Sequence, residues 1–379
     1  MIKANELVED FTLNDLFKAY FDCRKHKRNT LNALYFELNL ETNLLELYRD
    51  LKSGKYKIGK SICFVVTVPR PREVWAANFR DRIVHHLIYN FIAKRFYKRF
   101  IADTYSCIPK RGTLAAAKRL QHFAASATQN YTKPMYYLKA DLANFFVSIN
   151  KDILFKLIQK QVPEKFLQDI IKQIIYHDPT TNVYKKSSER KFALIPKHKS
   201  LFYSNKNNGL PIGNLSSQFF SNVYLDVMDK FIKEQLKCKY YVRYVDDFVI
   251  IDESPSNLNE YYNKIQNFIQ ENLLLSINPR KRMINKVQLG IDFVGFIIKP
   301  RRMQLRIKTI RKIFFQIKLW KNNYNPFDEL TLIQFLRTIN SYLGMLINTA
   351  GFNMRFMICN MVKSLFIEPD LCYSKMIIN

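Results

Sequence analysis

The sequence lacks the features that would indicate an exported or membrane-bound protein. Its six cysteines form no Cys-x-x-Cys pair, which argues against a disulfide framework and a zinc site. We find no uninterrupted apolar run long enough to span a bilayer, no lipidation signal and no signal peptide at the N-terminus. No internal repeat is apparent. We therefore expect a cytoplasmic protein with reduced thiols and no membrane association.

Acidic residues are scarce. The 379 residues include 32 Asp and Glu against 60 Lys and Arg, which gives a net charge of +28. Such a charge favours a polyanionic partner, because Lys and Arg that neutralise phosphates release counterions. A basic protein could also bind a membrane surface. With 48% hydrophobic residues, the chain is long enough for a large core and two or three subdomains.

Two adjacent aspartates stand between apolar runs. Asp246 and Asp247 lie between Tyr240–Val245 and Phe248–Ile251, a pattern that predicts a β-hairpin with the acids at its tip. Neighbouring carboxylates beside a core are costly, and a divalent cation such as Mg²⁺ removes this cost. The alternative is a solvated Asp-Asp turn that joins two strands.

A second acidic site follows an apolar strand. Asp141 comes directly after residues 136–140 and precedes an aromatic pair. An Asp that ends one strand can meet a hairpin tip on a neighbouring strand, and together they could hold two metal ions about 3.5–4 Å apart. Taken alone, such an Asp is more often a cap or turn residue. The presence of both acidic sites favours the metal interpretation.

Three motifs resemble those of reverse transcriptases. Tyr244-Val245-Asp246-Asp247 resembles their YxDD box, Asp141 with Phe146 resembles the first palm motif, and Gly209–Gln218 resembles the second. The resemblance implies an α+β fold of the right-hand fingers–palm–thumb type, with an antiparallel or mixed palm sheet and a helical thumb. It also implies RNA-directed DNA polymerase activity with two Mg²⁺ ions, or Mn²⁺ instead, bound by Asp141, Asp246 and Asp247.

The same resemblance implies roles for residues near the reacting groups. Leu142 would offer a backbone carbonyl to the second metal, and Phe146 would crowd a ribose 2′-OH and so favour dNTPs, although a plain core Phe is the alternative. Ile212 and Gly213 would lie against the substrate, because glycine lets the backbone approach closely. Lys281 would lie near the pyrophosphate leaving group.

Basic residues complete the expected substrate contacts. Arg72, with Arg70 as second choice, would hold the triphosphate through the guanidinium fork. Lys110 and Arg111 belong to the next fingers motif, and Gly295 to a tight bend in the primer-grip hairpin. The basic helices after residue 300 would bind the template–primer backbone, with Arg301, Arg302 and Arg306 as the named contacts.

We expect four regions. They are an N-terminal helical region (1–60), fingers (61–130), a palm (131–300) and a helical thumb (301–379). Residues 177–208 are a polar, basic insertion in the palm. A connection of this length is unusual, and a nucleic-acid or partner contact competes with a solvated linker.

The second motif also points to a subgroup. Where reverse transcriptases commonly carry QGxxxSP, this chain has Ile212-Gly213 and Ser217-Gln218. This form resembles prokaryotic enzymes of diversity-generating retroelements and of antiphage defence. We expect an RNA template, a DNA or RNA primer and a dedicated non-coding RNA, with an accessory protein or a homo-oligomer. A defence role is preferred. The alternatives are a mutagenic retroelement enzyme, untemplated or protein-primed synthesis, and a catalytically idle RNA-binding scaffold.

Overall fold

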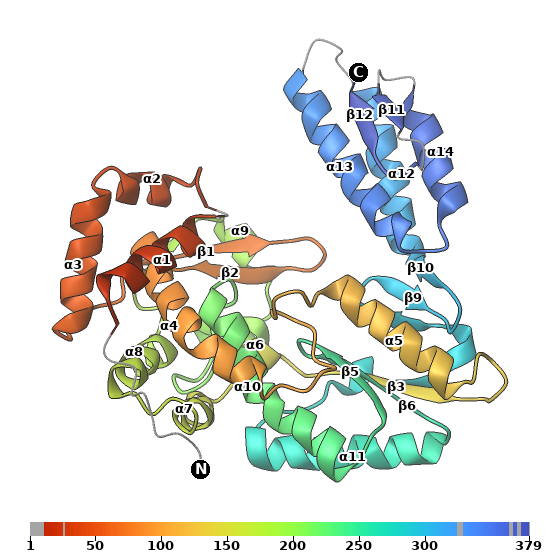
Figure 1. The fold of residues 1–379 in the computed structure, drawn as a ribbon, viewed down its shortest axis with the longest axis horizontal. Coiled ribbons are helices and arrows are strands. Elements are labelled where there is room, and N and C mark those ends of the chain that lie inside the picture. The colour runs from red at the N-terminus through yellow and green to blue at the C-terminus, as the bar shows by residue number, and fades with distance from the viewer. Residues whose placement is uncertain (1–10, 26, 324–328, 364–366, 370–372, 379) are drawn as a thin grey trace. The chain divides into compact units, whose positions relative to one another are not determined.

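The chain folds into helices interspersed with short strands, as seen in a computed structural model (Figure 1). The structure describes all residues except 1–10, 26, 324–328, 364–366, 370–372 and 379. Its sheets are antiparallel or mixed, which confirms the predicted α+β class. The chain divides into two compact units. Unit 1 draws on Met1–Ala102, Asp141–Lys237 and Asn263–Arg280, and unit 2 on Asp103–Ala140, Cys238–Tyr262 and Lys281–Asn379.

Unit 1 is mainly helical. Its helices are α1 (Leu13–Arg24), α2 (Leu31–Glu37), α3 (Leu40–Lys52), α4 (Phe79–Tyr97), α6 (Phe145–Ser148), α7 (Lys151–Gln159), α8 (Lys165–Tyr176), α9 (Glu189–Phe192) and α10 (Leu215–Lys230). The short turns η1 (Lys197–Lys199) and η2 (Leu201–Tyr203) precede α10, and the π-helix η3 (Phe231–Gln235) follows it. Helix α11 (Pro255–Leu273) begins in unit 2 and ends in unit 1.

Helix α4 carries much of the core of unit 1. Its buried residues lie all around the helix, as expected for a helix covered on several sides. Phe79 packs edge-on against Tyr20 of α1, with ring centroids 6.3 Å apart. At the other end of α4, Phe96 packs edge-on against Phe219 of α10 at 5.6 Å. These aromatic contacts join α1 and α10 to opposite ends of α4.

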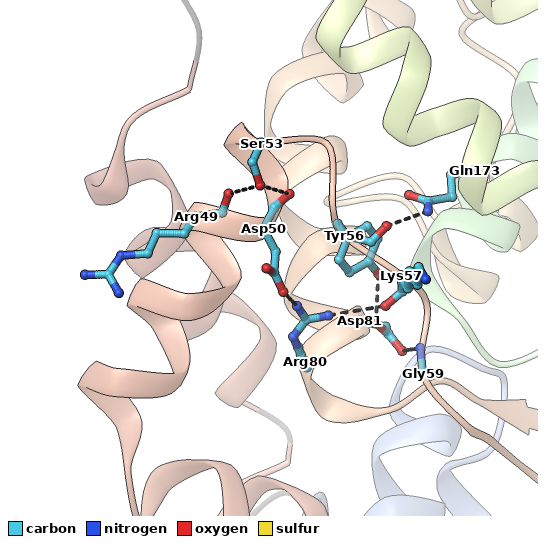
Figure 2. Close-up of polar contacts among 9 residues, drawn as sticks. All are labelled: Arg49, Asp50, Ser53, Tyr56, Lys57, Gly59, Arg80, Asp81 and Gln173. Carbon is cyan, nitrogen blue, oxygen red and sulfur yellow. Dashed lines mark hydrogen bonds and ion pairs between the residues drawn. The ribbon is translucent and has the colours of Figure 1, made fainter.

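A buried carboxylate fastens the residues before the first strand to α4 (Figure 2). Asp81 accepts hydrogen bonds from the Tyr56 hydroxyl at 2.8 Å and from the Gly59 N–H at 2.9 Å. Burial raises the pKa of Asp81, and these hydrogen bonds oppose that shift. Next to it, Arg80 forms an ion pair with Asp50 and lies over the Tyr56 ring. Arg80 therefore serves the packing of unit 1.

The hairpin in the region expected to form the fingers, here called the fingers hairpin, gains a third strand from the insertion. Strand β1 (Ser61–Val66) pairs antiparallel with β2 (Arg72–Ala76), and β4 (Val183–Lys185) joins the other edge of β1 in parallel. Burial alternates along β1, as expected for a sheet with one covered face. Cys63 and Trp75 lie on the covered face.

Unit 2 is built on a four-stranded sheet with the order β5-β6-β3-β7. The strands are β3 (Tyr136–Asp141), β5 (Tyr240–Tyr244), β6 (Asp247–Asp252) and β7 (Met283–Lys286), and α5 (Thr113–Ala127) packs on them. A second antiparallel sheet contains β8 (Ile291–Phe293), β9 (Phe296–Ile298) and β10 (Met303–Leu305). Strands β5, at the edge of this sheet, and β6, beside it, are buried on both faces, which agrees with their continuous apolar runs.

The C-terminal part of unit 2 is helical, as the sequence predicts for a thumb. It contains α12 (Ile307–Asn322), α13 (Glu329–Ile347) and α14 (Phe352–Lys363), with the strand pair β11 (Ile367–Pro369) and β12 (Met376–Ile378) beside them (Figure 1). Trp320 of α12 stacks on Phe335 of α13 with ring centroids 3.9 Å apart.

One helix of unit 2 bears on the expectation about apolar runs, which concerned uninterrupted ones; polar residues such as Gln334, Arg337 and Asn340 interrupt the run in this helix. Within the described part of the chain, the stretch Leu330–Ile347 of α13 is long and apolar enough to cross a membrane by length and composition alone. Core helices also pass this test, so it is weak evidence. One face of this helix, which includes Ile339 and Leu343, is buried in the core of unit 2.

Candidate functional site

The two adjacent aspartates lie at a hairpin turn, as the sequence predicts. Strands β5 and β6 pair up to Tyr244 and Asp247, which leaves Val245 and Asp246 as a two-residue connection. Val245 adopts a positive φ of 56°, which is strained for a β-branched residue. Such a conformation persists only when its surroundings hold it in place.

A buried arginine holds this turn, and the sequence analysis did not identify it. Arg243 of β5 is 1% exposed, and its guanidinium donates a hydrogen bond to the Val245 carbonyl at 2.8 Å. Its backbone pairs with Asp103 and Tyr105 through hydrogen bonds of 3.0 and 3.1 Å. The sequence did contain a signal for this role: a charged residue inside an apolar strand is expected to be buried, and a buried guanidinium needs hydrogen-bond partners.

A lysine links the aspartate hairpin to the next sheet of unit 2. Lys139 Nζ of β3 lies 3.5 Å from Asp247 Oδ2 and donates a hydrogen bond to the Asp292 carbonyl at 2.6 Å. The Asp292 side chain in turn forms an ion pair with Arg306, the residue directly before α12. The chain of contacts therefore runs from a predicted metal ligand to the predicted primer grip and thumb.

Asp141 is the last residue of β3, and the sheet order places β3 beside β6. The Asp141 carbonyl accepts a hydrogen bond from the Asn278 N–H at 2.8 Å, and the following Leu142 forms a bridge with Ile277. The Leu142 side chain is buried. Asp141 therefore ends a strand, as the sequence predicts, and its backbone is hydrogen-bonded to Asn278.

The metal assignment stays a prediction. Among the residues that the structure describes, no three His, Cys, Asp or Glu side chains gather closely enough to hold a metal ion. The chemistry of the predicted ligands suits the ion, since carboxylate oxygens are what Mg²⁺ prefers. Asp141, Asp246 and Asp247 are the residues that would hold it.

Within unit 1, the predicted gate residue lies beside the second motif. Phe146 is half-buried in α6, and its carbonyl accepts a hydrogen bond from the Leu210 N–H at 2.8 Å. The neighbouring Phe145 is buried. Of this aromatic pair, Phe145 therefore serves the core and Phe146 is the one that can reach a substrate.

The second motif is joined to the fingers hairpin. The Ile212 carbonyl accepts a hydrogen bond from the Trp75 N–H of β2 at 2.7 Å. Gly213 has φ +125°, and a Cβ on it would lie 2.5 Å from the Trp75 carbonyl oxygen, so only glycine fits. Asn214, which sequence reasoning did not single out, accepts a hydrogen bond from Ala77. Unit 1 thus brings Ile212 and Gly213 together with the strand that Arg72 begins.

The predicted basic fingers residues differ in their surroundings. Arg72 and Arg70 are exposed at the start of β2 and in the turn before it, where a triphosphate could reach them. In unit 2, Lys110 is exposed in a tight turn at φ 63°. The half-buried Arg111 donates a hydrogen bond to the Thr104 carbonyl at 2.9 Å, so Arg111 at least partly stabilises its own loop.

The remaining predicted residues lie in unit 2. Lys281 is exposed at the end of the turn η4 (Pro279–Lys281). Gly295, at φ +98°, forms with Val294 the two-residue turn of the β8–β9 hairpin, which is the predicted tight bend. Arg301 and Arg302 are exposed in the next turn, whereas Arg306 is half-buried in its pair with Asp292.

Comparison with known proteins identifies the class. Residues 69–298 match the family model described as reverse transcriptase (RNA-dependent DNA polymerase), and this match covers more than half of the chain. The chain belongs to the reverse transcriptase family.

Two individual proteins show weaker similarity to this chain. The putative COX1/OXI3 intron 2 protein of Saccharomyces cerevisiae is 20% identical over 318 residues, which covers 68% of this chain and 34% of that protein. The chain therefore spans about a third of this relative's length. A structure of telomerase from Candida albicans in complex with a fragment of telomeric RNA covers 81% of this chain and 62% of its own, at 11% identity and a TM-score of 0.46.

Proposed function

We propose that this chain is an RNA-directed DNA polymerase that extends a DNA or RNA primer with dNTPs. The observation that carries the proposal is the Val245–Asp246 turn, which a buried arginine holds. It leads into β6, the strand that begins with Asp247 and lies next to the strand that Asp141 ends. Membership of the reverse transcriptase family supports the same reaction.

Each predicted residue has a role in this reaction. Asp141, Asp246 and Asp247 would hold two divalent ions, which when bound stabilise the attacking and leaving oxygens of nucleotidyl transfer. Arg72 binds the triphosphate, and Phe146 excludes the ribose 2′-OH. Arg243 keeps the strained turn in the conformation that presents the two adjacent carboxylates.

We further propose that the enzyme acts in the cytoplasm, in antiphage defence, together with a dedicated non-coding RNA. The IGxxxSQ form is shared with enzymes of diversity-generating retroelements, and the basic insertion and Ile108 of the expected fingers region favour defence. The alternative is a mutagenic enzyme of a diversity-generating retroelement. Adenine-directed errors in the DNA product would favour the alternative, and faithful or repetitive product would favour defence.

Primer extension tests the reaction. Purified wild-type chain, Asp247→Asn and Asp169→Asn are incubated with Mg²⁺, dNTPs and a DNA primer annealed to a defined RNA. We expect extension by the wild type and none by Asp247→Asn. Asp169→Asn removes an exposed carboxylate of α8 and should behave as the wild type. Equal extension by all three proteins would show that the metal assignment is wrong.

The template is identified by sequencing nucleic acids that co-purify with the wild type and with the Asp246→Ala, Asp247→Ala double variant. RNA in both, with complementary DNA in the wild type alone, is the expected result. Identical DNA in both preparations would instead support the scaffold hypothesis.

A further inference from the structure

The insertion is a fixed part of unit 1 from Val183 to Lys206, here called the inserted segment. Besides the β4 pairing, the Val65 N–H donates a hydrogen bond to Ser187 Oγ at 3.0 Å. Further along, the Leu201 N–H donates to the buried Glu73 carboxylate at 3.0 Å. These contacts exclude the solvated linker that the sequence left open.

A small core lies between the inserted segment and the fingers sheet. Leu201 is buried with Cys63 and Trp75, and Phe192 and Phe202 pack against them. The Phe202 and Trp75 ring centroids are 5.1 Å apart. Leu201, Phe192 and Phe202 are therefore the side chains that pack the inserted segment against the fingers sheet.

Two tyrosines remain outside this core. Tyr184 is 55% exposed and Tyr203 is 64% exposed. Folding gains little from leaving large aromatic rings in water, and exposed aromatic residues beside cations are typical of surfaces that stack on bases.

The charge of the segment is strongly one-sided. One acidic residue, Glu189, stands among seven basic ones: Lys185, Lys186, Arg190, Lys191, Lys197, Lys199 and Lys206. Glu189 is paired with Lys185, at 3.3 Å. Lys197 Nζ lies 5.4 Å from the centre of the Tyr203 ring, so a cation and an aromatic face are presented together.

We propose that the inserted segment binds single-stranded RNA, with Tyr203 and Tyr184 stacking on unpaired bases and the lysines neutralising phosphates. Base pairs in a duplex are closed to such stacking, whereas splayed bases are open to it. A protein partner fits less well, because the cores of protein interfaces are depleted of charge. The inference rests on the proposed function, in which this chain copies an RNA, and it assigns the unpaired part of that RNA to the inserted segment.

Binding of two fluorescent probes to the full chain tests the proposal. One probe is an unstructured 20-nucleotide RNA and the other a blunt RNA duplex, each measured by anisotropy over a range of KCl. Tyr203→Ala should weaken single-strand binding about 10-fold and leave duplex binding unchanged. Tyr184→Ala should act in the same direction. The double variant Lys197→Ala, Lys199→Ala should make the plot of log association constant against log KCl concentration less steep, by about 1.4 in slope.

The matched control is Tyr35→Ala with Lys27→Ala. Tyr35 is 68% exposed on α2 of the same unit, so the control removes a similar ring and a similar charge elsewhere. We expect wild-type affinity for both probes. Melting curves of all variants identify any loss of folding.

Unchanged single-strand affinity in Tyr203→Ala would overturn the proposal, as would an equal loss for both probes. If these variants instead lost a co-purifying protein, the surface would be a protein interface. Extension of a blunt, pre-annealed primer–template separates this inference from the proposed function. Failure of the wild type to extend it rejects the polymerase, whereas loss of RNA binding in variants with normal extension supports the segment as a separate site.

Discussion

Replacing Lys139 with methionine tests the link between the aspartate hairpin and the primer grip. The Lys139 and Asp247 side chains are 18% and 23% exposed, so both are largely removed from solvent. If Asp247 holds divalent ions as proposed, these ions would neutralise its carboxylate and the attraction between this pair would contribute less. The hydrogen bond from Lys139 to the Asp292 carbonyl then remains as the main contribution of this side chain.

The expected magnitude follows from that bond. A hydrogen bond from a charged donor contributes about 1.5–3 kcal/mol, and we take about 2 kcal/mol for Lys139. If the variant loses about 2 kcal/mol of the free energy that positions the primer end, kcat/KM for the primer–template falls about 30-fold, at 1.36 kcal/mol per factor of ten. The KM for dNTP should stay unchanged, because Lys139 contacts Asp247 and Asp292 rather than Arg72 and Phe146, the residues proposed to bind dNTP. Single-nucleotide extension at varied primer–template and dNTP concentrations measures both values.

Two variants give this prediction its controls. Lys139→Arg keeps a charged donor and should recover most of the activity. Lys133→Met removes a lysine whose pair with Glu253 is exposed, 44% and 61% by side chain, so its kinetics should stay within about twofold of the wild type. A raised KM for dNTP with an unchanged KM for primer would refute the reasoning.

Three further predictions concern unit 1. Gly213→Ala should destabilise the fold by about 2 kcal/mol and raise the KM for dNTP, because the new Cβ would lie 2.5 Å from the Trp75 carbonyl oxygen. Thermal melting measures the loss of stability, and Gly112→Ala, at a position with open space around it, is the control. Burial lowers the pKa of His85 from 6.5 to about 3, so the unfolded chain binds a proton that the folded chain does not, and stability falls as pH drops below about 6.5. Urea unfolding should show about 2 kcal/mol less stability at pH 5 than at pH 7 from this group, a difference that His85→Gln removes. Phe146→Val should raise ribonucleotide incorporation relative to dNTP about 10- to 200-fold, and equal selectivity in both proteins would assign Phe146 to the core.

Local patterns in the sequence were sufficient for the turns of the candidate site. The two aspartates and Gly295 lie where the alternation of apolar runs and turn residues predicts. Gly213 likewise sits at a position that needs a positive φ. Such features depend on a few neighbouring residues, and these leave a clear signal in the sequence.

Contacts between distant residues were harder to predict. Lys139 and Asp292 are far apart in the chain, and nothing near Lys139 indicates that its partner is a backbone carbonyl. The parallel strand β4 has three residues, too few for a periodic pattern, and it was placed in a possible linker. Arg80 likewise pairs with Asp50, which lies 30 residues before it in the chain.

The inserted segment leaves the fingers hairpin and returns to it at directly opposite residues. Val65, which holds Ser187, and Glu73, which holds Leu201, are register partners in β1 and β2. Residues 188–200 therefore form a loop with closely spaced ends, and closing a longer or shorter loop between such ends changes the free energy little. Loops of other lengths between these two anchor points should therefore leave the pairing of β1 with β2, and the strand that Arg72 begins, in place.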